Sequence, residues 1–355
     1  MRIAAITILL SVLVCIATSF VEKQQANATT SLTFVVPEGW PQPVYDFSKN
    51  PLTKEGFELG RKLFYDGRLS ADGNFPCSSC HQQFAAFSTY DHNLSHGINN
   101  SLTTRNAPGL FNLAWQKEFM HDGGINHLDL QPLAPITASN EMGETLNNVL
   151  AKLRADATYR KMFKAAFGDE GISTQKMSKA LSQFLLMMVS ANSKYDKVMR
   201  GEASFNLPER LGYDLFKKKK CTSCHTEPLF SDYTYRNVGV ALDSFINDVG
   251  RMRITRLADD SLKFKVPSLR NVMVTAPYLH DGRFYSTYEV FNHYRSSVIK
   301  MKNTDSLVAN GIPLSNFEIG QITAFLYTLT DSTFIRDLRF GPPQDAVIPP
   351  VMHVH

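Results

Sequence analysis

The chain has 355 residues, with 37 Lys and Arg against 33 Asp and Glu and a formal net charge of +4 at pH 7. That balance is too weak to indicate a nucleic-acid-binding protein, whose signature is a concentrated basic surface. The length suffices for two domains of ordinary size. Four of the five cysteines form two short motifs, so none is left for a disulfide framework.

An apolar run opens the sequence. Residues 3–20 (IAAITILLSVLVCIATSF) follow Arg2 and precede a polar stretch, which is the pattern of a secretory signal peptide. We expect residues 1–28 to form this signal, with cleavage after Ser19 or Ala28, and the protein to be periplasmic. Two alternatives stay open: lipidation at Cys15, and retention of the run as a membrane anchor.

The pattern Cys-x-x-Cys-His occurs twice and is typical of covalent c-type haem attachment. Two thiols one turn apart can add to the haem vinyl groups, and the adjacent histidine can then bind the iron. A zinc site would require further Cys or His pairs, and a redox dithiol would require a βαβ context. We therefore predict two covalently bound haem c groups. Their attachment residues are Cys77, Cys80 and His81, and Cys221, Cys224 and His225.

An internal repeat surrounds these motifs. The sequence LGRKLF (59–64) precedes the first motif and LGYDLF (211–216) the second, and their apolar spacing predicts a helix running into each site. Residues 107–124 match residues 266–283 at one constant offset. We infer a duplicated, mostly α-helical protein of two cytochrome c-like domains, residues 45–203 and 204–345, each with one haem.

Helical periodicity dominates the remaining chain. Apolar stripes predict helices over 144–166, 175–200 and 315–330, and the last of these opens with a capping box at Ser315 and Glu318. Alternating strand patterns are scarce. The pattern breaks at 200–208, where we place the boundary between the copies.

Two haems in one chain suit either an electron carrier or an enzyme. Acid–base groups near one iron would favour an enzyme, and the proline-rich segment 123–143 supplies Gln131 and Glu141. Glu141 has a second interpretation as the N-terminal carboxylate of the helix that follows it.

The order of the motifs resembles the bacterial dihaem cytochrome c peroxidase family, which includes MauG-like enzymes. The resemblance spans Leu59 to about Leu329 and includes C-S-S-C-H, R-N-A-P-G-L-F-N (105–112), C-T-S-C-H and V-P-S-L-R-N-V-M-V-T-A-P-Y-L-H-D-G (266–282). It implies reduction of hydrogen peroxide to water, with electrons from a small redox protein such as cytochrome c or a cupredoxin. The first haem would react with peroxide and the second would relay electrons.

The resemblance also implies roles for single residues. His96 would cap the first iron at rest, with His92 as the alternative. Gln131 and Glu141 would form the distal pair, and Glu141 would be the acid–base residue. A structural calcium ion between the haems would use Asn106, Thr275 and Pro277.

Two positions depart from the family pattern. Where many members have a tryptophan between the haems, this chain has His121, and its nearest tryptophan is Trp115. Where many peroxidases have a methionine on the second haem, this chain has Tyr294, as MauG-type members do; His293 and Met301 are the alternatives. A tyrosinate ligand would lower the potential of that haem.

Tyr294 thus favours, and His121 disfavours, a MauG-like oxidase that modifies a partner protein, which is the main alternative to peroxidase activity. A dihaem electron carrier without catalysis is the other. The run Lys217–Lys220 is either a solvated helix face or a docking patch for an acidic donor. The sequence leaves open whether the protein forms a homodimer.

Overall fold

The computed structural model describes residues 29–344. The expected signal peptide and Cys15 lie outside the described residues, as does the chain after residue 344. The described chain is mostly helical and holds a single small sheet, which confirms the expected class. Between residues 29 and 344, no helix has the length and apolar character needed to cross a bilayer.

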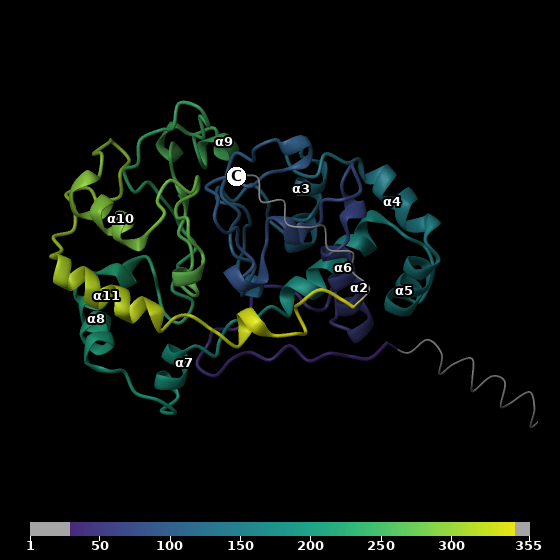
Figure 1. The fold of residues 1–355 in the computed structure, drawn as a ribbon, viewed down its shortest axis with the longest axis horizontal. Coiled ribbons are helices and arrows are strands. Elements are labelled where there is room, and N and C mark those ends of the chain that lie inside the picture. The colour runs from purple at the N-terminus through teal and green to yellow at the C-terminus, as the bar shows by residue number, and fades with distance from the viewer. Residues whose placement is uncertain (1–28, 345–355) are drawn as a thin grey trace, which may run out of the picture.

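The helices gather in two groups on either side of the molecule (Figure 1). The first group contains α2 (Lys54–Phe64), α3 (Leu133–Thr137), α4 (Leu146–Ala155), α5 (Ala157–Phe167) and α6 (Thr174–Leu186). The second contains α8 (Leu207–Lys218), α10 (Thr287–Asn292) and α11 (Asn316–Tyr327). The short elements between them are α7 (Lys194–Met199), α9 (Met252–Thr255), β1 (Tyr235–Arg236) and the antiparallel β2 (Phe264–Lys265).

Each haem motif is preceded by a helix that packs on a later helix through a glycine. A Cβ on Gly60 in α2 would lie 2.0 Å from the carbonyl oxygen of Ala180 in α6. A Cβ on Gly212 in α8 would lie 1.9 Å from the carbonyl oxygen of Gln321 in α11. The two helix pairs approach so closely because these positions carry no side chain. The helices predicted from LGRKLF and LGYDLF are both present.

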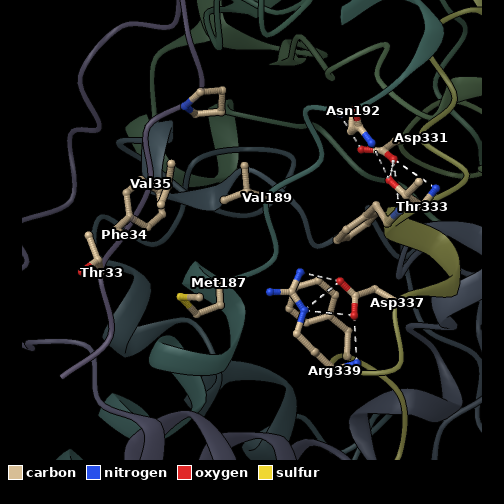
Figure 2. A pocket seen from close by; sticks show the side chains of 13 residues that line it. Thr33, Phe34, Val35, Met187, Val189, Asn192, Asp331, Thr333, Asp337 and Arg339 are labelled. Carbon is tan, nitrogen blue, oxygen red and sulfur yellow. Dashed lines mark hydrogen bonds and ion pairs between the residues drawn. The ribbon is translucent and has the colours of Figure 1, made fainter. Parts of the chain in front are cut away.

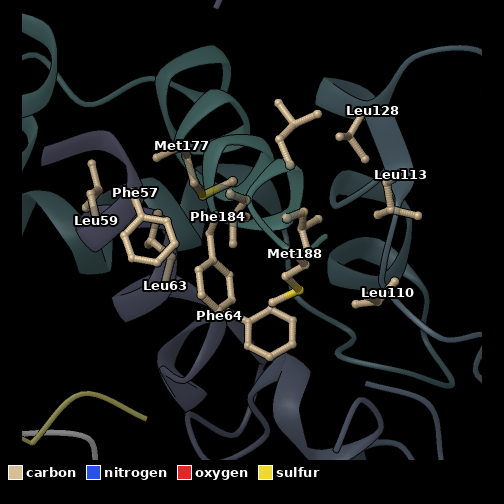
Figure 3. Close-up of a cluster of buried hydrophobic side chains, with 14 of the residues drawn as sticks. Phe57, Leu59, Leu63, Phe64, Leu110, Leu113, Leu128, Met177, Phe184 and Met188 are labelled. Atoms are coloured by element: carbon tan, nitrogen blue, oxygen red, sulfur yellow. The ribbon is translucent and has the colours of Figure 1, made fainter. Parts of the chain in front are cut away.

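Two hydrophobic clusters lie under these helix pairs. The larger one is built around α2 and α6, where Phe64, Phe184 and Met188 interlock (Figure 3). The smaller one surrounds α8 and α11. After α11 the chain returns to the larger cluster, in which Phe334 and Phe340 are buried. The C-terminal segment therefore packs on the first helix group.

The prediction of one helix over 144–166 is wrong, because Asp156 interrupts it. Asp156 has extended backbone and ends α4. Its side chain accepts hydrogen bonds from the N–H groups of Thr158 and Tyr159, and so begins α5. An ion pair of 2.6 Å with Arg68 fixes the same carboxylate. A capping side chain thus prevails over a continuous apolar stripe.

The helix predicted over 175–200 is also divided, into α6 and α7. After α6 the chain turns toward the repeat segment 107–124, where the amide N–H of Asn112 donates to the carbonyl oxygen of Met188 (2.9 Å). The helix restarts at a capping box of Ser193 and Asp196. The capping box predicted at Ser315 is confirmed at the start of α11.

We predict that Gly60→Ala and Gly212→Ala each destabilise the protein. Alanine favours helix, but the added methyl group would force the paired helices apart, which typically costs roughly 1–3 kcal/mol. Gly320 in α11 is the matched control, because a Cβ there meets nothing within 4 Å. Gly320→Ala should stabilise the protein by up to about 1 kcal/mol. Equilibrium unfolding in urea measures both, and unchanged stability of the first two variants would refute the close approach.

Candidate haem centres

Each Cys-x-x-Cys-His motif folds into a single tight turn. The turns begin at Cys77 and Cys221, and in each the N–H of the motif histidine donates to the carbonyl oxygen of the first cysteine, at 3.0 Å for His81 and 2.9 Å for His225. This geometry keeps both thiols and the imidazole of a motif within one turn, as attachment to a single haem requires.

Both motif histidines are oriented by a main-chain carbonyl. His81 donates through Nδ1 to the carbonyl oxygen of Phe87 (2.7 Å), and His225 donates to that of Phe230 (3.1 Å). Burial lowers the pKa of both imidazoles, so they are neutral near pH 7. Because a carbonyl can only accept, Nδ1 carries the proton and Nε2 is left to bind iron. The residues present fit an axially ligated haem at each motif.

The loop that carries His96 is tied to Glu141, the candidate acid–base residue. The N–H of Ile98 donates to the carbonyl oxygen of Glu141 (2.8 Å). Gly97 lies against the carbonyl group of Asn140, where a Cβ would be 2.2 Å from the oxygen. The backbone of the predicted distal ligand and that of the predicted acid–base residue therefore form one packed unit.

Both residues of this unit lie beside the first pair of thiols, and Sγ of Cys80 is 3.8 Å from the carbonyl oxygen of His96. Burial raises the pKa of Cys77 and Cys80 to about 12, and the nearby charge of Glu141 adds to the increase. Burial also raises the pKa of Glu141 itself. The Nδ1 atom of His96 is buried and has no hydrogen-bond partner within the described chain. An unpaired buried nitrogen of this kind is compatible with a site that a ligand would complete.

Glu141 does not lie at a helix N-terminus. The helix that follows begins at Leu146 and is capped by Thr145, while Glu141 belongs to the preceding turn, where its N–H donates to the carbonyl oxygen of Ala138 (3.0 Å). The helix-dipole interpretation of this carboxylate is therefore weakened.

The other residues predicted for the first centre are less well supported. His92 is exposed, and its ring meets that of His96 edge-on, with centroids 5.2 Å apart. Gln131 follows a short turn, and no hydrogen bond joins it to Glu141 in residues 29–344. His92 and Gln131 both remain predictions.

Tyr294 lies beside the second pair of thiols. It belongs to the π-helical turn His293–Ser297, which continues α10. Burial raises the pKa of its hydroxyl, and the charges of Cys221 and Cys224 raise it further. Such a position suits an axial oxygen donor that iron would deprotonate.

The two alternative ligands of the second haem have other partners. The Nε2 atom of His293 is bonded to the carbonyl oxygen of Val238 at 2.9 Å. The sulfur of Met301 accepts from the side-chain amide of Asn237 at 3.8 Å. These contacts favour Tyr294, whose ligation remains a prediction.

Two reciprocal hydrogen bonds join the halves of the chain. The N–H of Asn106 donates to the carbonyl oxygen of His280 (2.8 Å), and the N–H of Lys265 donates to that of His121 (2.7 Å). The His121 side chain also bonds the carbonyl oxygen of Asn106 through Nε2 (2.9 Å). Burial and the adjacent Arg105 lower the pKa of His121 to about 4. A neutral imidazole thus occupies the place where the family commonly has tryptophan.

The predicted calcium ligands come from both halves. The bond between Asn106 and His280 brings Asn106 to the end of the segment that contains Thr275 and Pro277. The side chains of Asn106 and Thr275 already bond main-chain carbonyl oxygens, of Asn93 and Val272. Calcium therefore remains a prediction.

A cavity of about 490 Å³ lies away from both motifs (Figure 2). It separates residues 33–37 of the N-terminal segment from residues 331–340 of the C-terminal segment. None of its lining residues belongs to a haem motif or to the Glu141 loop, so we assign it no part in the chemistry.

The carbonyl acceptors at Phe87 and Phe230 were missed in the sequence. A signal was present, since each motif histidine is followed, six and five residues later, by the pair Phe-Ser. In both halves this serine anchors the loop, with Ser88 donating to Ala107 (2.7 Å) and Ser231 to Val266 (2.6 Å).

Comparisons with known proteins agree with this geometry. A family model described as di-haem cytochrome c peroxidase matches residues 54–204. The methylamine utilization protein MauG of Methylophilus methylotrophus is 31% identical over 313 residues, covering 86% of this chain and 90% of that protein. Cytochrome c551 peroxidase of Nitrosomonas europaea is 31% identical over 301 residues, covering 81% and 84%. A solved MauG-like protein associated with microbial copper homeostasis has 33% identity and a TM-score of 0.81, covering 88% and 99%.

We predict two covalent haems per chain. A pyridine haemochrome assay on denatured protein should give two for the parent, and one for the double variant Cys221→Ala/Cys224→Ala. The matched variant Cys77→Ala/Cys80→Ala should also retain one. Zinc in place of iron would contradict the assignment of both motifs.

We predict that Tyr294 controls the spectrum and potential of the second haem. Tyr294→Phe should alter the ferric absorption and EPR spectra, and Tyr294→Met should raise the potential, because a thioether favours ferrous iron more than a phenolate does. Met301→Leu is the control and should leave both unchanged. The opposite pattern would transfer the role to Met301.

Proposed function

The chain belongs to the dihaem cytochrome c peroxidase family, and on that premise we propose that it reduces hydrogen peroxide to water with two electrons from a small redox protein. It is an oxidoreductase of this family, with haem c as its cofactor. We further propose that it arose by duplication of a cytochrome c-like domain and acts in the periplasm. The reciprocal bonds at equivalent places, Asn106 to His280 and Lys265 to His121, support the duplication.

The difference between the two centres carries the proposal. The first places beside its thiols a buried carboxylate of raised pKa, Glu141, and the ring of His96, whose Nδ1 atom has no hydrogen-bond partner among the described residues. The second places a tyrosine, Tyr294, beside its thiols. The carboxylates near Cys224, Asp232 and Asp305, are paired with Arg236, whereas burial alone raises the pKa of Glu141. A carboxylate free to exchange protons at the first centre is what a division between catalysis and electron transfer requires.

Haem supplies the redox chemistry when it is bound. The chain supplies proton transfer: Glu141 takes a proton from one oxygen of peroxide and returns it to the other, which then leaves as water. Two electrons and two further protons balance the formation of two water molecules. His96, as the proposed resting cap, would move aside for peroxide to enter, and the packed unit that it shares with Glu141 would couple this movement to the acid–base residue.

The electron donor would dock near the second motif. Of the lysines before this motif, Lys217 pairs with Asp214 and Lys219 with Glu318. Lys218 and Lys220 are exposed and make no ion pair among the described residues. Their charges would suit an acidic surface on a cytochrome c or a cupredoxin.

A MauG-like oxidase that acts on a partner protein is the second candidate. The position of Tyr294 favours it, as does the similarity to MauG and to a MauG-like structure. His121 in the place of tryptophan disfavours it. Steady-state peroxide turnover with reduced cytochrome c separates the two, since the oxidase would consume peroxide only slowly without its protein substrate.

We predict that Glu141→Gln lowers peroxide turnover by about 10²–10⁴-fold, the usual range for loss of a general acid–base group. Haem content and thermal stability should remain those of the parent, because Glu141 bonds no other side chain in residues 29–344.

Glu144→Gln is the matched control on the same segment. Glu144 is buried and forms an ion pair with Lys152. Its loss should cost roughly 1–3 kcal/mol of stability and leave turnover near the parent value. Turnover of Glu141→Gln within about twofold of the parent, well below the range expected for a general acid–base residue, would remove Glu141 from the mechanism.

A further inference from the structure

The loop that holds His225 is itself held by one segment of the second half. Residues 228–231 contain the Phe230 carbonyl group that accepts from His225, and residues 266–270 bond this loop at every position. The bonds run from Arg270 Nε to the Pro228 oxygen (2.8 Å), from Ser268 Oγ to the Leu229 oxygen (2.6 Å), from the Leu269 N–H to the Phe230 oxygen (3.2 Å) and from Ser231 Oγ to the Val266 oxygen (2.6 Å).

The first half lacks the two side-chain donors. At the constant offset of the repeat, Gly109 stands where the second half has Ser268, and Phe111 stands where it has Arg270. The loop around Phe87 is held by a bond within itself, from the Phe87 N–H to the Gln82 oxygen (2.8 Å), and by the bond from Ser88 Oγ to the Ala107 oxygen (2.7 Å). The two axial histidines therefore depend on differently supported carbonyl groups.

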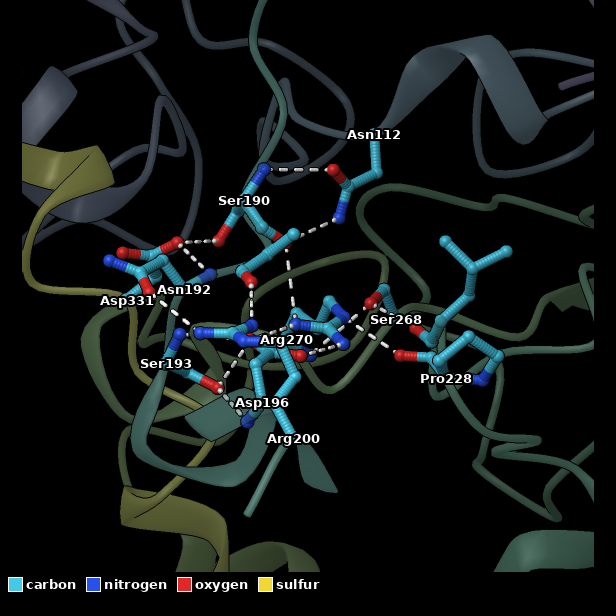
Figure 4. Close-up of polar contacts among 12 residues, drawn as sticks. Asn112, Ser190, Asn192, Ser193, Asp196, Arg200, Pro228, Ser268, Arg270 and Asp331 are labelled. Atoms are coloured by element: carbon cyan, nitrogen blue, oxygen red, sulfur yellow. Dashed lines mark hydrogen bonds and ion pairs between the residues drawn. The ribbon is translucent and has the colours of Figure 1, made fainter. Parts of the chain in front are cut away.

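Arg270 is fixed on all sides (Figure 4). Its side chain is fully buried, and its guanidinium group forms two bonds to the Asp196 carboxylate (2.7 and 3.0 Å). A third bond reaches the carbonyl oxygen of Ser190 (3.3 Å), and the ring of Trp40 covers the group at 4.4 Å. Because the fork of donors is rigid, these contacts aim Nε at Pro228.

We propose that Arg270 and Ser268 are positioning residues for His225 that set the potential of the second haem independently of the first. By fixing the loop, they hold the Phe230 carbonyl at bonding distance from Nδ1. A hydrogen bond at Nδ1 makes the imidazole a stronger electron donor to iron, which stabilises the ferric state. The proposal rests on the second haem that the proposed function requires.

The direction of the potential change separates positioning from a charge effect. When the loop loosens, the Nδ1 bond weakens and the potential of the second haem rises. When a buried positive charge is lost, the ferric state becomes less costly and the potential falls. Ser268→Ala removes a donor without changing any charge, and Arg270→Lys keeps the charge but loses the Nε bond to Pro228.

Spectroelectrochemical titration of the holoprotein, with EPR of the second ferric haem, tests the proposal. Both variants should raise the potential of the second haem and shift its EPR g-values, while the first haem stays as in the parent. Ser88→Ala is the matched control, because Ser88 ties the equivalent loop of the first half. It should leave the second haem unchanged.

Unchanged potentials in Ser268→Ala overturn the proposal, even if Arg270→Lys does not fold. Equal shifts of both haems would indicate general loosening and would also overturn it. Failure of the proposed function is distinguishable, since it would appear as absent peroxide turnover or as a single haem in the parent protein, before any variant is measured.

Discussion

The bond between Nδ1 of each motif histidine and a main-chain carbonyl is the interaction on which the structure depends. A histidine next to two haem-linked cysteines can serve iron only if its ring is held in one tautomer and one orientation. Both halves provide this with a loop that ends in Phe-Ser and brings the Phe87 or Phe230 carbonyl to the ring. The helices before the motifs, which pack through Gly60 and Gly212, contact the two loops through the ring pairs Phe64–Phe87 and Phe216–Phe230.

The junction between the halves is polar and tightly paired. Asp122 is fully buried between Arg105 and Arg253, and Arg105 also binds Asp248. Buried charges are tolerated where each has a partner, and losing one partner is costly. Together with the reciprocal backbone bonds, these pairs hold the halves in one arrangement. A fixed junction suits electron transfer, because it keeps the separation of the two centres constant.

The sequence indicated the motifs, the helices around them and the capping box at Ser315, because these signals are local. It did not indicate the break at Asp156, where a cap and a distant partner, Arg68, outweigh an unbroken apolar stripe. It also did not indicate the network of Arg270 and Asp196, whose members come from segments far apart in the chain. Glu141 could be named from the family pattern, but its burial beside the thiols depends on tertiary packing.

The peroxidase and the oxidase alternatives differ at the second centre more than at the first. Either activity can use the buried carboxylate of Glu141, since cleaving peroxide requires proton transfer in both cases. With Tyr294 as a ligand and His225 held through Nδ1, two separate features of the second centre would stabilise the ferric state. A second haem of lowered potential passes electrons readily to the first haem. It is also easier to oxidise, so it can hold an oxidising equivalent at a smaller free-energy cost. Which of these the protein exploits would then depend on its partner, a small electron donor or a protein to be modified.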